Sequence, residues 1–254
     1  MNENVKKIWI TGASSGIGKA LAIKFSNEGW QVAVSARREK LLEELSNNNS
    51  NIHSFPLDVT DEKNSFNTFQ KILKKLNNID LCLFSTGTYD PKTEREINME
   101  QIHNTMNVNF FGTLNCIKAV EKYFKEKKTG HISIVSSVAG YRGLPNSTGY
   151  GPSKAALINL TESLYFDFKK YNVRVSLISP GFIKTPMTDK NNFKMPFIKS
   201  SEFAADKIYD GLIKSNAFEI TFPKQLTIIM KILKILPYWK YFYLIRKLTK
   251  YQRR

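Results

Sequence analysis

The sequence contains few cysteines and histidines. Of its 254 residues, two are cysteine and three are histidine. Cys82 and Cys116 are too few for a disulfide framework, and both lie in apolar runs typical of buried free thiols in a reducing cytosol. His53, His103 and His131 are scattered and lack the spacing of metal ligands. We therefore expect a cytoplasmic protein that binds no metal ion.

The sequence also lacks a long apolar run. It holds no stretch of about 20 uninterrupted apolar residues, so we expect no simple transmembrane helix. A strand-like run starts at Val5, which leaves no room for an apolar targeting segment. With 42% hydrophobic and 24% charged residues, the composition is that of a globular protein large enough to bury a substantial core.

Acidic residues are absent from the last part of the sequence. Residues 224–254 hold nine Lys or Arg and no Asp or Glu, so they supply more than half of the net charge of +16. A basic surface can attract nucleic acid, anionic lipid or a phosphorylated small molecule. No known nucleic-acid-binding module accompanies this charge, so we expect no nucleic acid partner.

Short apolar runs alternate with longer helical patterns along the chain, which is typical of βαβ crossovers and a parallel sheet. Strands are expected at 5–10, 30–36, 52–59, 80–85, 131–137, 173–179 and 217–222. Helices are expected at 16–27, 39–46, 60–76, 99–127, 150–171 and 202–214. The predicted fold is α/β, with a doubly wound, parallel seven-stranded sheet of Rossmann type in a single domain, followed by C-terminal helices.

A glycine-rich turn follows the first predicted strand. The stretch TGASSGIGKAL places Gly12, Gly16 and Gly18 between that strand and a helix. Glycines permit a tight turn and a close approach of the backbone to a pyrophosphate, which the free N–H groups of the helix N-terminus can bind. A plain strand–helix turn is the alternative, but this position at the start of an α/β chain favours nucleotide binding. The same predicted site includes Ser14, Ser15 and Ile17.

The end of the second predicted strand indicates which cofactor is bound. An NAD site usually carries an acid here for the ribose hydroxyl, whereas arginine suits a 2′-phosphate. This strand ends in SARRE, with Ala36 in the place of the acid and Arg37 and Arg38 after it. We therefore expect NADP(H) rather than NAD(H), although the arginines could form a solvated surface pair. Asp58 and Val59 are expected to line the adenine, and Asp58 could equally start the next helix.

A tyrosine and a lysine open another predicted helix. Tyr150 and Lys154, in TGYGPSKAAL, are four residues apart and share a helix face. A free phenol has a pKa of about 10, and lowering it by three units needs roughly 4 kcal/mol. One cation about 4 Å away supplies that only at a reduced effective dielectric of about 20, so the pair requires a site with little water. Ser137, at the end of the fifth predicted strand, can donate a hydrogen bond to a substrate oxygen.

The order and spacing of these motifs resemble the short-chain dehydrogenase/reductase superfamily. TGASSGIG, LDV, N-x-x-G, SSVAG, Y-x-x-S-K and PG-x-x-x-T follow one another between about Val5 and Phe222. The resemblance implies an oxidoreductase that transfers a hydride between the nicotinamide and a carbonyl or alcohol, with NADP(H) as the cofactor that the arginines predict. The shared motifs stop near Phe222, so we expect a dinucleotide-binding oxidoreductase domain, 1–222, and a basic amphipathic helical extension, 223–254.

The resemblance also implies roles for individual residues. Tyr150 is the general acid/base, Ser137 polarises the carbonyl, and Lys154 lowers the tyrosine pKa and binds the nicotinamide ribose. Asn109, within the long predicted helix, holds a water in a proton relay. Pro180, Gly181, Ile183 and Thr185, after the sixth strand, contact the nicotinamide end. Related proteins form dimers or tetramers through the helices predicted at 99–127 and 150–171, so a homodimer or homotetramer is expected.

One motif departs from the pattern of the superfamily. Its members often carry Asn-Asn-Ala-Gly after the fourth strand, where this chain has Phe84, Ser85, Thr86 and Gly87. Gly87, which keeps the backbone near the cofactor, is retained, and Ser85 or Thr86 could replace some hydrogen bonds of the asparagines.

The loop after Thr185 contains apolar residues that suggest a lid over an apolar substrate. They are Met187, Phe193, Met195 and Phe197. The alternative is that these side chains only pack the loop on the body of the protein.

The last part of the chain predicts two amphipathic helices broken at Pro237. Lys224, Thr227, Lys231 and Lys234 fall on one stripe of the first helix, and the rest of its surface is apolar. Aromatic residues beside cations in the second helix are typical of a membrane interface, so residues 224–254 predict a peripheral anionic membrane surface. Docking on the domain or on a neighbouring subunit, where the helices would cap the pocket, is the alternative.

Two rival functions follow from these features. The chain could be a non-catalytic, NADP(H)-sensing protein, which an incomplete set of catalytic residues would favour. It could also be a membrane-surface binding protein whose C-terminal helices carry its main role.

Overall fold

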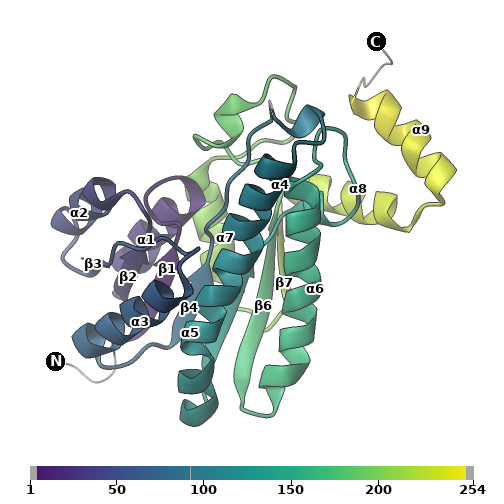
Figure 1. Ribbon diagram of the computed structural model, residues 1–254. Helices are drawn as coiled ribbons and strands as arrows, with labels where there is room; N and C mark the ends of the chain where they lie inside the picture. Colours follow the sequence, from purple (N-terminus) through teal and green to yellow (C-terminus); the bar gives the residue numbers. More distant parts are fainter. Residues whose placement is uncertain (1–4, 92, 250–254) are drawn as a thin grey trace.

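The computed structural model describes residues 5–91 and 93–249 as one parallel sheet covered by helices (Figure 1). The sheet has seven strands in the order β3-β2-β1-β4-β5-β6-β7. The strands are β1 (Lys7–Thr11), β2 (Gln31–Ser35), β3 (Ile52–Ser54), β4 (Leu81–Phe84), β5 (Gly130–Val135), β6 (Val173–Pro180) and β7 (Glu219–Phe222). All neighbouring strands pair in parallel, which confirms the predicted doubly wound α/β fold.

Helices connect successive strands and continue beyond the last one. The α-helices are α1 (Gly16–Asn27), α2 (Glu39–Asn47), α3 (Glu62–Leu76), α4 (Met99–Met106), α5 (Gly112–Lys127), α6 (Tyr150–Lys169), α7 (Ser201–Ile213), α8 (Lys224–Ile235) and α9 (Tyr238–Thr249). Within the described ranges, none of them is long and apolar enough to cross a membrane.

Each face of the sheet has its own hydrophobic core, because side chains alternate along a strand. In β1, Ile8 and Ile10 point to the face covered by α1 and α7, where they meet Phe25 of α1. Trp9 points to the opposite face, covered by α3, α5 and α6, and stacks on Phe69 of α3 with ring centroids 5.6 Å apart. Helices therefore cover both faces, and the carboxyl ends of the strands are left to form a site.

Two predicted elements are shorter or more divided than the sequence pattern suggested. The strand predicted at 52–59 is limited to Ile52–Ser54 as β3. Beyond it, the Phe55 and Leu57 N–H groups still donate to the carbonyls of Val34 and Ala36. The helix predicted at 99–127 contains a π-helical turn, Asn107–Phe111, between α4 and α5. Such turns are frequent at functional sites, and this one holds the predicted site residue Asn109.

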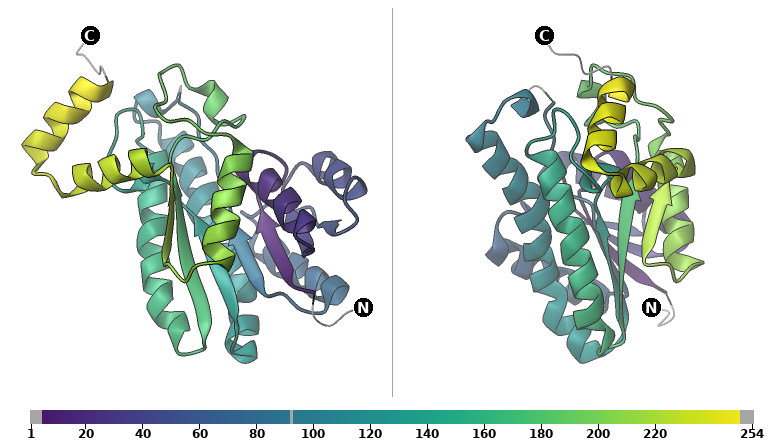
Figure 2. Two further views of the ribbon diagram at one scale, coloured as in Figure 1. Left: turned by 180° about the vertical axis from the view of Figure 1, so that it is seen from behind. Right: turned by 90° about the vertical axis from the view of Figure 1, so that its right-hand side faces the viewer.

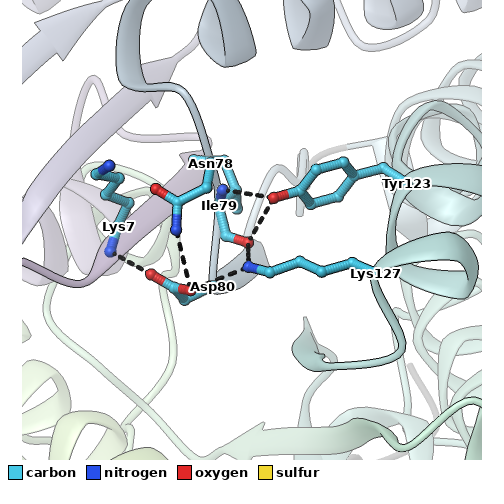
Figure 3. A network of polar contacts seen from close by, with 6 residues as sticks. All are labelled: Lys7, Asn78, Ile79, Asp80, Tyr123 and Lys127. Carbon is cyan, nitrogen blue, oxygen red and sulfur yellow. Dashed lines mark hydrogen bonds and ion pairs between the residues drawn. The ribbon is translucent and has the colours of Figure 1, made fainter. Parts of the chain in front are cut away.

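A polar network fixes the edge of the sheet opposite the carboxyl ends of the strands (Figure 3). The Asp80 carboxylate accepts hydrogen bonds from the Lys7 backbone N–H, at 2.9 Å, and from Lys127 Nζ, at 3.1 Å. The Tyr123 hydroxyl accepts a hydrogen bond from the Ile79 N–H and donates one to the Ile79 carbonyl. The starts of β1 and β4 are thereby tied to α5.

The C-terminal helices pack on the domain, but none of their described residues lines the cavity at the switch point of the sheet, so the predicted capping of the pocket is not found. Leu226, Met230 and Leu233 of α8 and Tyr241 of α9 join a hydrophobic cluster with Val138, which follows β5. The break between the helices falls at Leu236 and Pro237, as the sequence predicts.

His131 predicts how stability depends on pH. Burial in β5 lowers the pKa of His131 from 6.5 to about 3, and its Nε2 lies 2.8 Å from the Ser176 hydroxyl. Between those pH values the unfolded chain binds a proton that the folded chain does not, so stability falls as the pH falls. We expect the free energy of unfolding to drop by about 2 kcal/mol more between pH 7 and pH 5 than in His131→Gln, measured by urea denaturation.

The matched control for this measurement is His103, which is exposed on α4. His103→Gln makes the same substitution at an exposed position and serves as the comparison for His131→Gln. An unchanged pH dependence in His131→Gln would show that His131 titrates normally in the folded protein.

Candidate active site

A cavity of about 270 Å³ lies at the carboxyl edge of the sheet, above β1 and β4. At this point the strand order reverses, because the chain winds outward from β1 to β3 and then returns to β4 on the other side. Ligands of open α/β sheets bind at such switch points. The predicted cofactor residues that line the cavity are Gly12, Ser14, Ser15, Gly16, Ile17, Gly18, Arg37, Arg38, Asp58, Val59, Gly87 and Thr185.

The glycine-rich turn between β1 and α1 forms the floor of the cavity. Gly12 has a φ of +71° and Gly16 a φ of +56°, values that L-residues rarely adopt. A Cβ atom on Gly18 would lie 2.4 Å from the Gly12 carbonyl oxygen, so a side chain there would disrupt the turn. The Ser15 side chain makes no capping hydrogen bond to the first turn of α1. The backbone N–H groups of that turn are therefore available to an anionic ligand.

Arg38 is held against this turn. Its Nε and Nη2 donate to the Ser14 hydroxyl at 3.1 and 2.8 Å, and Nη2 also donates to the Ser15 hydroxyl at 2.6 Å. Arg37 and Ala36 line the same rim of the cavity. Arg37 and Arg38 therefore bring two guanidinium groups to the rim at the end of β2, and Glu39, which starts α2, is not among the described residues that line the cavity.

Asp58 and Val59 lie on the wall of the cavity, and Asp58 also serves the local fold. The Asp58 carboxylate accepts hydrogen bonds from the Thr60 N–H, at 3.0 Å, and from the Thr60 hydroxyl, at 2.8 Å. Asp58 thus lines the cavity, but the alternative that it starts the next helix is wrong: α3 begins at Glu62, and Asp61 caps it by accepting a hydrogen bond from the Asn64 N–H.

The three predicted catalytic side chains Ser137, Tyr150 and Lys154 come together where β5 ends and α6 begins. The Ser137 hydroxyl lies beside the Tyr150 phenol, where it acts to lower the pKa of that phenol. Lys154 Nζ lies 5.7 Å from the centre of the Tyr150 ring and donates to the Val135 carbonyl at 3.0 Å. Val135 in turn lines the cavity, so Lys154 lies directly behind its wall.

Burial controls the charges of this group. It lowers the pKa of Lys154 to about 8, and no carboxylate contributes to this shift. Burial also raises the pKa of Tyr150, against the opposing effect of the Ser137 hydrogen bond, and the charge of Glu94 raises it further. The expected lowering of the tyrosine pKa by Lys154 is not seen in the protein without a bound ligand.

Asn109 connects three parts of the site from its π-helical turn. Its Oδ1 accepts from the Thr88 N–H at 2.7 Å, and its Nδ2 donates to the Thr88 carbonyl at 3.1 Å and to the Ser153 hydroxyl at 2.9 Å. A Cβ atom on Gly87 would lie 3.5 Å from Lys154 Nζ and 3.6 Å from Asn109 Oδ1. Gly87 therefore leaves open the space beside Lys154 and Asn109.

Three predicted residues after β6 are not on the cavity wall. The Gly181 N–H donates to the Phe222 carbonyl at 2.7 Å, and Ile183 is buried. With Pro180, which ends β6, these residues support the wall from behind, and Thr185 and Met187 form it.

In the loop that follows, Phe193 packs on Phe182 with ring centroids 5.9 Å apart, which fits the packing alternative for that side chain.

The stretch that replaces Asn-Asn-Ala-Gly lines the cavity through Ser85 and Thr86. The Ser85 hydroxyl donates to the Thr11 carbonyl at 2.6 Å, so it joins β4 to β1. The Thr86 hydroxyl is buried and has no hydrogen-bond partner among the described residues, so it is available to a polar group of a ligand.

Other lining residues were not identified from the sequence. Leu57, Val108, Val135 and Pro186 complete the wall, and nothing in the sequence distinguishes these apolar residues from core residues.

Glu94 is the polar residue that sequence reasoning missed. It is buried, and its carboxylate accepts from the backbone N–H groups of Gly149, at 2.6 Å, and Tyr150, at 3.0 Å. A carboxylate is favoured at a helix N-terminus, where the helix dipole is positive. Glu94 thus caps α6 from a distant loop and fixes the turn that carries Tyr150. Its position in the sequence, in a loop before α4, gives no signal of this contact.

Comparisons with known proteins agree with this geometry. A family profile described as short chain dehydrogenase matches residues 6–195. An uncharacterized oxidoreductase from Myxococcus xanthus is 32% identical over 232 residues, which are 90% of this chain and 91% of the relative. The 3-oxoacyl-(acyl-carrier-protein) reductase of Thermotoga maritima is 33% identical over 185 residues, 71% of this chain and 75% of the relative.

A solved structure shares the fold. It is a short chain dehydrogenase from Burkholderia cenocepacia in complex with NADP, with a TM-score of 0.78 and 25% identity. The match covers 92% of this chain and 95% of that one. The sequence match over most of the chain, together with the shared fold, shows that this chain is an oxidoreductase of the short-chain dehydrogenase/reductase superfamily.

Proposed function

We propose that the chain is an NADP(H)-dependent reductase of a carbonyl group, or catalyses the reverse oxidation of an alcohol, on an apolar substrate. The observation that carries this proposal is the group of Ser137, Tyr150 and Lys154 beside a cavity floored by a glycine-rich turn. A proton donor and a cation are what reduction of a carbonyl requires from the protein.

A bound nicotinamide cofactor supplies the hydride for the carbonyl carbon, and the side chains of the chain supply the proton. The Tyr150 phenol donates its proton to the carbonyl oxygen, and the Ser137 hydroxyl donates a hydrogen bond to the same oxygen. With a pKa of about 8, Lys154 is mostly charged at pH 7, so its ammonium stabilises the phenolate that the proton transfer leaves behind. Asn109 holds the Thr88 loop and Ser153 in place around this group.

The residues of the cavity fit a dinucleotide with a 2′-phosphate. The uncapped first turn of α1 suits a pyrophosphate, and the free Thr86 hydroxyl can hydrogen-bond a polar group of the ligand. Arg38, positioned by Ser14 and Ser15, presents a guanidinium for the 2′-phosphate, with Arg37 beside it. The NADP bound by the Burkholderia relative supports this choice of cofactor.

The proposed substrate carries its carbonyl on an apolar group. Met187 lines the cavity, and the exposed Phe197 lies in the loop after it. The Thermotoga relative, whose name assigns it an acyl chain with a ketone, supports a substrate of this type. We also propose that the chain divides at residue 222 into an oxidoreductase domain and a helical extension.

We also propose a homodimer or homotetramer in the cytoplasm. Phe111, at the start of α5, and Phe166, on α6, are 49% and 72% exposed, as expected of helices that contact another subunit. Cys82 and Cys116 are both free and buried, which fits a reducing compartment.

Replacing Tyr150 tests the mechanism. Tyr150→Phe removes the proton donor and keeps the ring, so we expect kcat to fall by about 10²–10⁴-fold. The assay is NADPH oxidation with a panel of aldehydes and ketones. Tyr165→Phe, an exposed position on the same helix, is the control and should keep the wild-type rate. Equal rates for Tyr150→Phe and wild type would reject Tyr150 as the acid.

Replacing Arg38 tests the choice of cofactor. Arg38→Ala removes a charge-assisted contact worth about 1.5–3 kcal/mol, so we expect the preference for NADPH over NADH, measured as the ratio of kcat/KM, to fall by at least tenfold. Lys40→Ala removes an exposed charge close in sequence that does not line the cavity, and should leave the ratio unchanged. A ratio unaffected by Arg38→Ala would place the phosphate elsewhere.

A further inference from the structure

The helices α8 and α9 form an arm on one side of the domain (Figures 1 and 2). Arg142 fixes this arm, since its Nη1 donates to the carbonyls of Leu233, at 2.8 Å, and Leu236, at 2.6 Å, at the end of α8. The Arg142 guanidinium also lies 4.1 Å from the centre of the Tyr241 ring, and the Tyr241 hydroxyl donates to the Gly143 carbonyl at 2.5 Å. The arm therefore has a defined inner face and a defined outer face.

The outer face of α8 is as apolar as its inner face. Leu226, Met230 and Leu233 are buried against the domain. On the opposite side of the helix, four isoleucines face solvent with exposures of 55%, 40%, 54% and 80%: Ile228, Ile229, Ile232 and Ile235. A helix that is apolar on both sides is expected to have a second partner that covers the outer side.

Helix α9, which follows the break at Pro237, carries exposed aromatic side chains. Tyr238, Trp239, Phe242 and Tyr243 are between 56% and 71% exposed. We use the term outer face for these four residues together with the four isoleucines of α8. Aromatic rings with a polar edge are enriched where apolar and aqueous phases meet, as at the surface of a bilayer.

The charges around the outer face have a single sign. Lys234, Lys240, Arg246 and Lys247 are exposed on the arm. Residues 224–254 contain no Asp or Glu, so no acid of this segment balances them. Lys231 is the exception among the cations of α8, because it pairs with Glu219 of β7.

This charge decides between the possible partners of the outer face. Two copies of the arm placed face to face would bring like charges together, which is unfavourable. An anionic bilayer surface offers apolar contacts for the isoleucines and aromatic rings and negative headgroups for the cations. Each helix has 12 residues and is therefore about 18 Å long, which suits lying in the interface and is too short to cross it.

We propose that the outer face of α8 and α9 binds the surface of a bilayer that contains anionic phospholipid. This inference goes beyond the proposed oxidoreductase function and rests on different residues. Its test needs no enzymatic assay.

Binding to vesicles tests the proposal on the full chain. Vesicles of 30% phosphatidylglycerol in phosphatidylcholine should co-sediment the protein at least tenfold more strongly than vesicles of pure phosphatidylcholine. Binding should weaken at 0.5 M NaCl, because salt screens exposed charges. No co-sedimentation with the phosphatidylglycerol vesicles, or equal binding to both kinds, would overturn the proposal.

Trp239 is a built-in reporter of the arm. Of the three tryptophans, Trp9 and Trp30 are 0% and 7% exposed, whereas Trp239 is 70% exposed. Adding phosphatidylglycerol vesicles should shift the tryptophan emission to shorter wavelength, and Trp239→Phe should abolish the shift. A shift that persists in Trp239→Phe would place the contact elsewhere.

Double substitutions test which exposed residues are needed for vesicle binding. Ile228→Ser with Ile232→Ser should lower vesicle binding at least tenfold, and Lys240→Gln with Lys247→Gln should do the same. Phe66→Ser with Ile97→Ser changes residues that are 53% and 79% exposed but lie outside the arm, and should leave binding unchanged.

Two further measurements test whether a loss of vesicle binding in these variants comes from unfolding or from a lost contact between subunits. The melting temperature should be the same in all these variants, because the side chains are exposed in the wild type. If light scattering showed a smaller assembly for Ile228→Ser with Ile232→Ser, and the wild type did not bind vesicles, the outer face would be a contact between copies and the proposal would fail.

Discussion

The site depends on Lys154, a buried lysine that pairs with no carboxylate among the described residues. Lys154 is 4% exposed, and the described contact of its ammonium is the Val135 carbonyl at 3.0 Å. Keeping a charge there is costly, so the surrounding backbone must hold it firmly. The Ser136 hydroxyl donates to the Lys154 carbonyl at 2.7 Å, and a Cβ atom on Gly140 would lie only 2.7 Å from that same carbonyl. The junction between β5 and α6 is built around this helix turn.

Burial also changes the pKa of Tyr150, in the direction opposite to that of Lys154. Burial raises the pKa of the phenol and lowers the pKa of the Lys154 ammonium, because it favours the neutral form of each group. Transfer of a proton from the phenol then leaves an anion next to a cation, which a dry site favours more strongly than water does. Glu94 fixes the first turn of the helix that holds both groups, at the expense of a negative charge that keeps the phenol protonated.

The sequence predicts the parts of this protein that repeat a regular pattern. The strand alternation gives the seven-stranded sheet, and the range 16–27 predicted for the first helix coincides with α1. Some functional motifs consist of residues that are close together in the sequence, so they could be identified without the structure. They are the glycine-rich turn, the arginines after β2 and the pair Tyr150 and Lys154. The paired C-terminal helices follow from the same kind of pattern, broken at Pro237.

Contacts between distant segments could not be predicted in this way. Glu94 reaches the start of α6 from a loop, and Arg142 reaches the end of α8. The division of the predicted helix 99–127 by a π-helical turn depends on the side-chain bonds that Asn109 makes to Thr88 and Ser153, which no helical periodicity records. The effect of burial on Lys154 and Tyr150 likewise depends on the packing of residues far apart in sequence.

The most direct test of this account is the pKa of Lys154 itself. Carbon-13 NMR of the protein labelled at lysine Cε, titrated from pH 6 to pH 11, reports the protonation of each lysine, and Lys154→Met assigns the signal. The account predicts one lysine with a pKa of about 8. A value near the ordinary 10.5 would show that the ammonium is solvated and would contradict the buried, unpaired lysine on which the site depends.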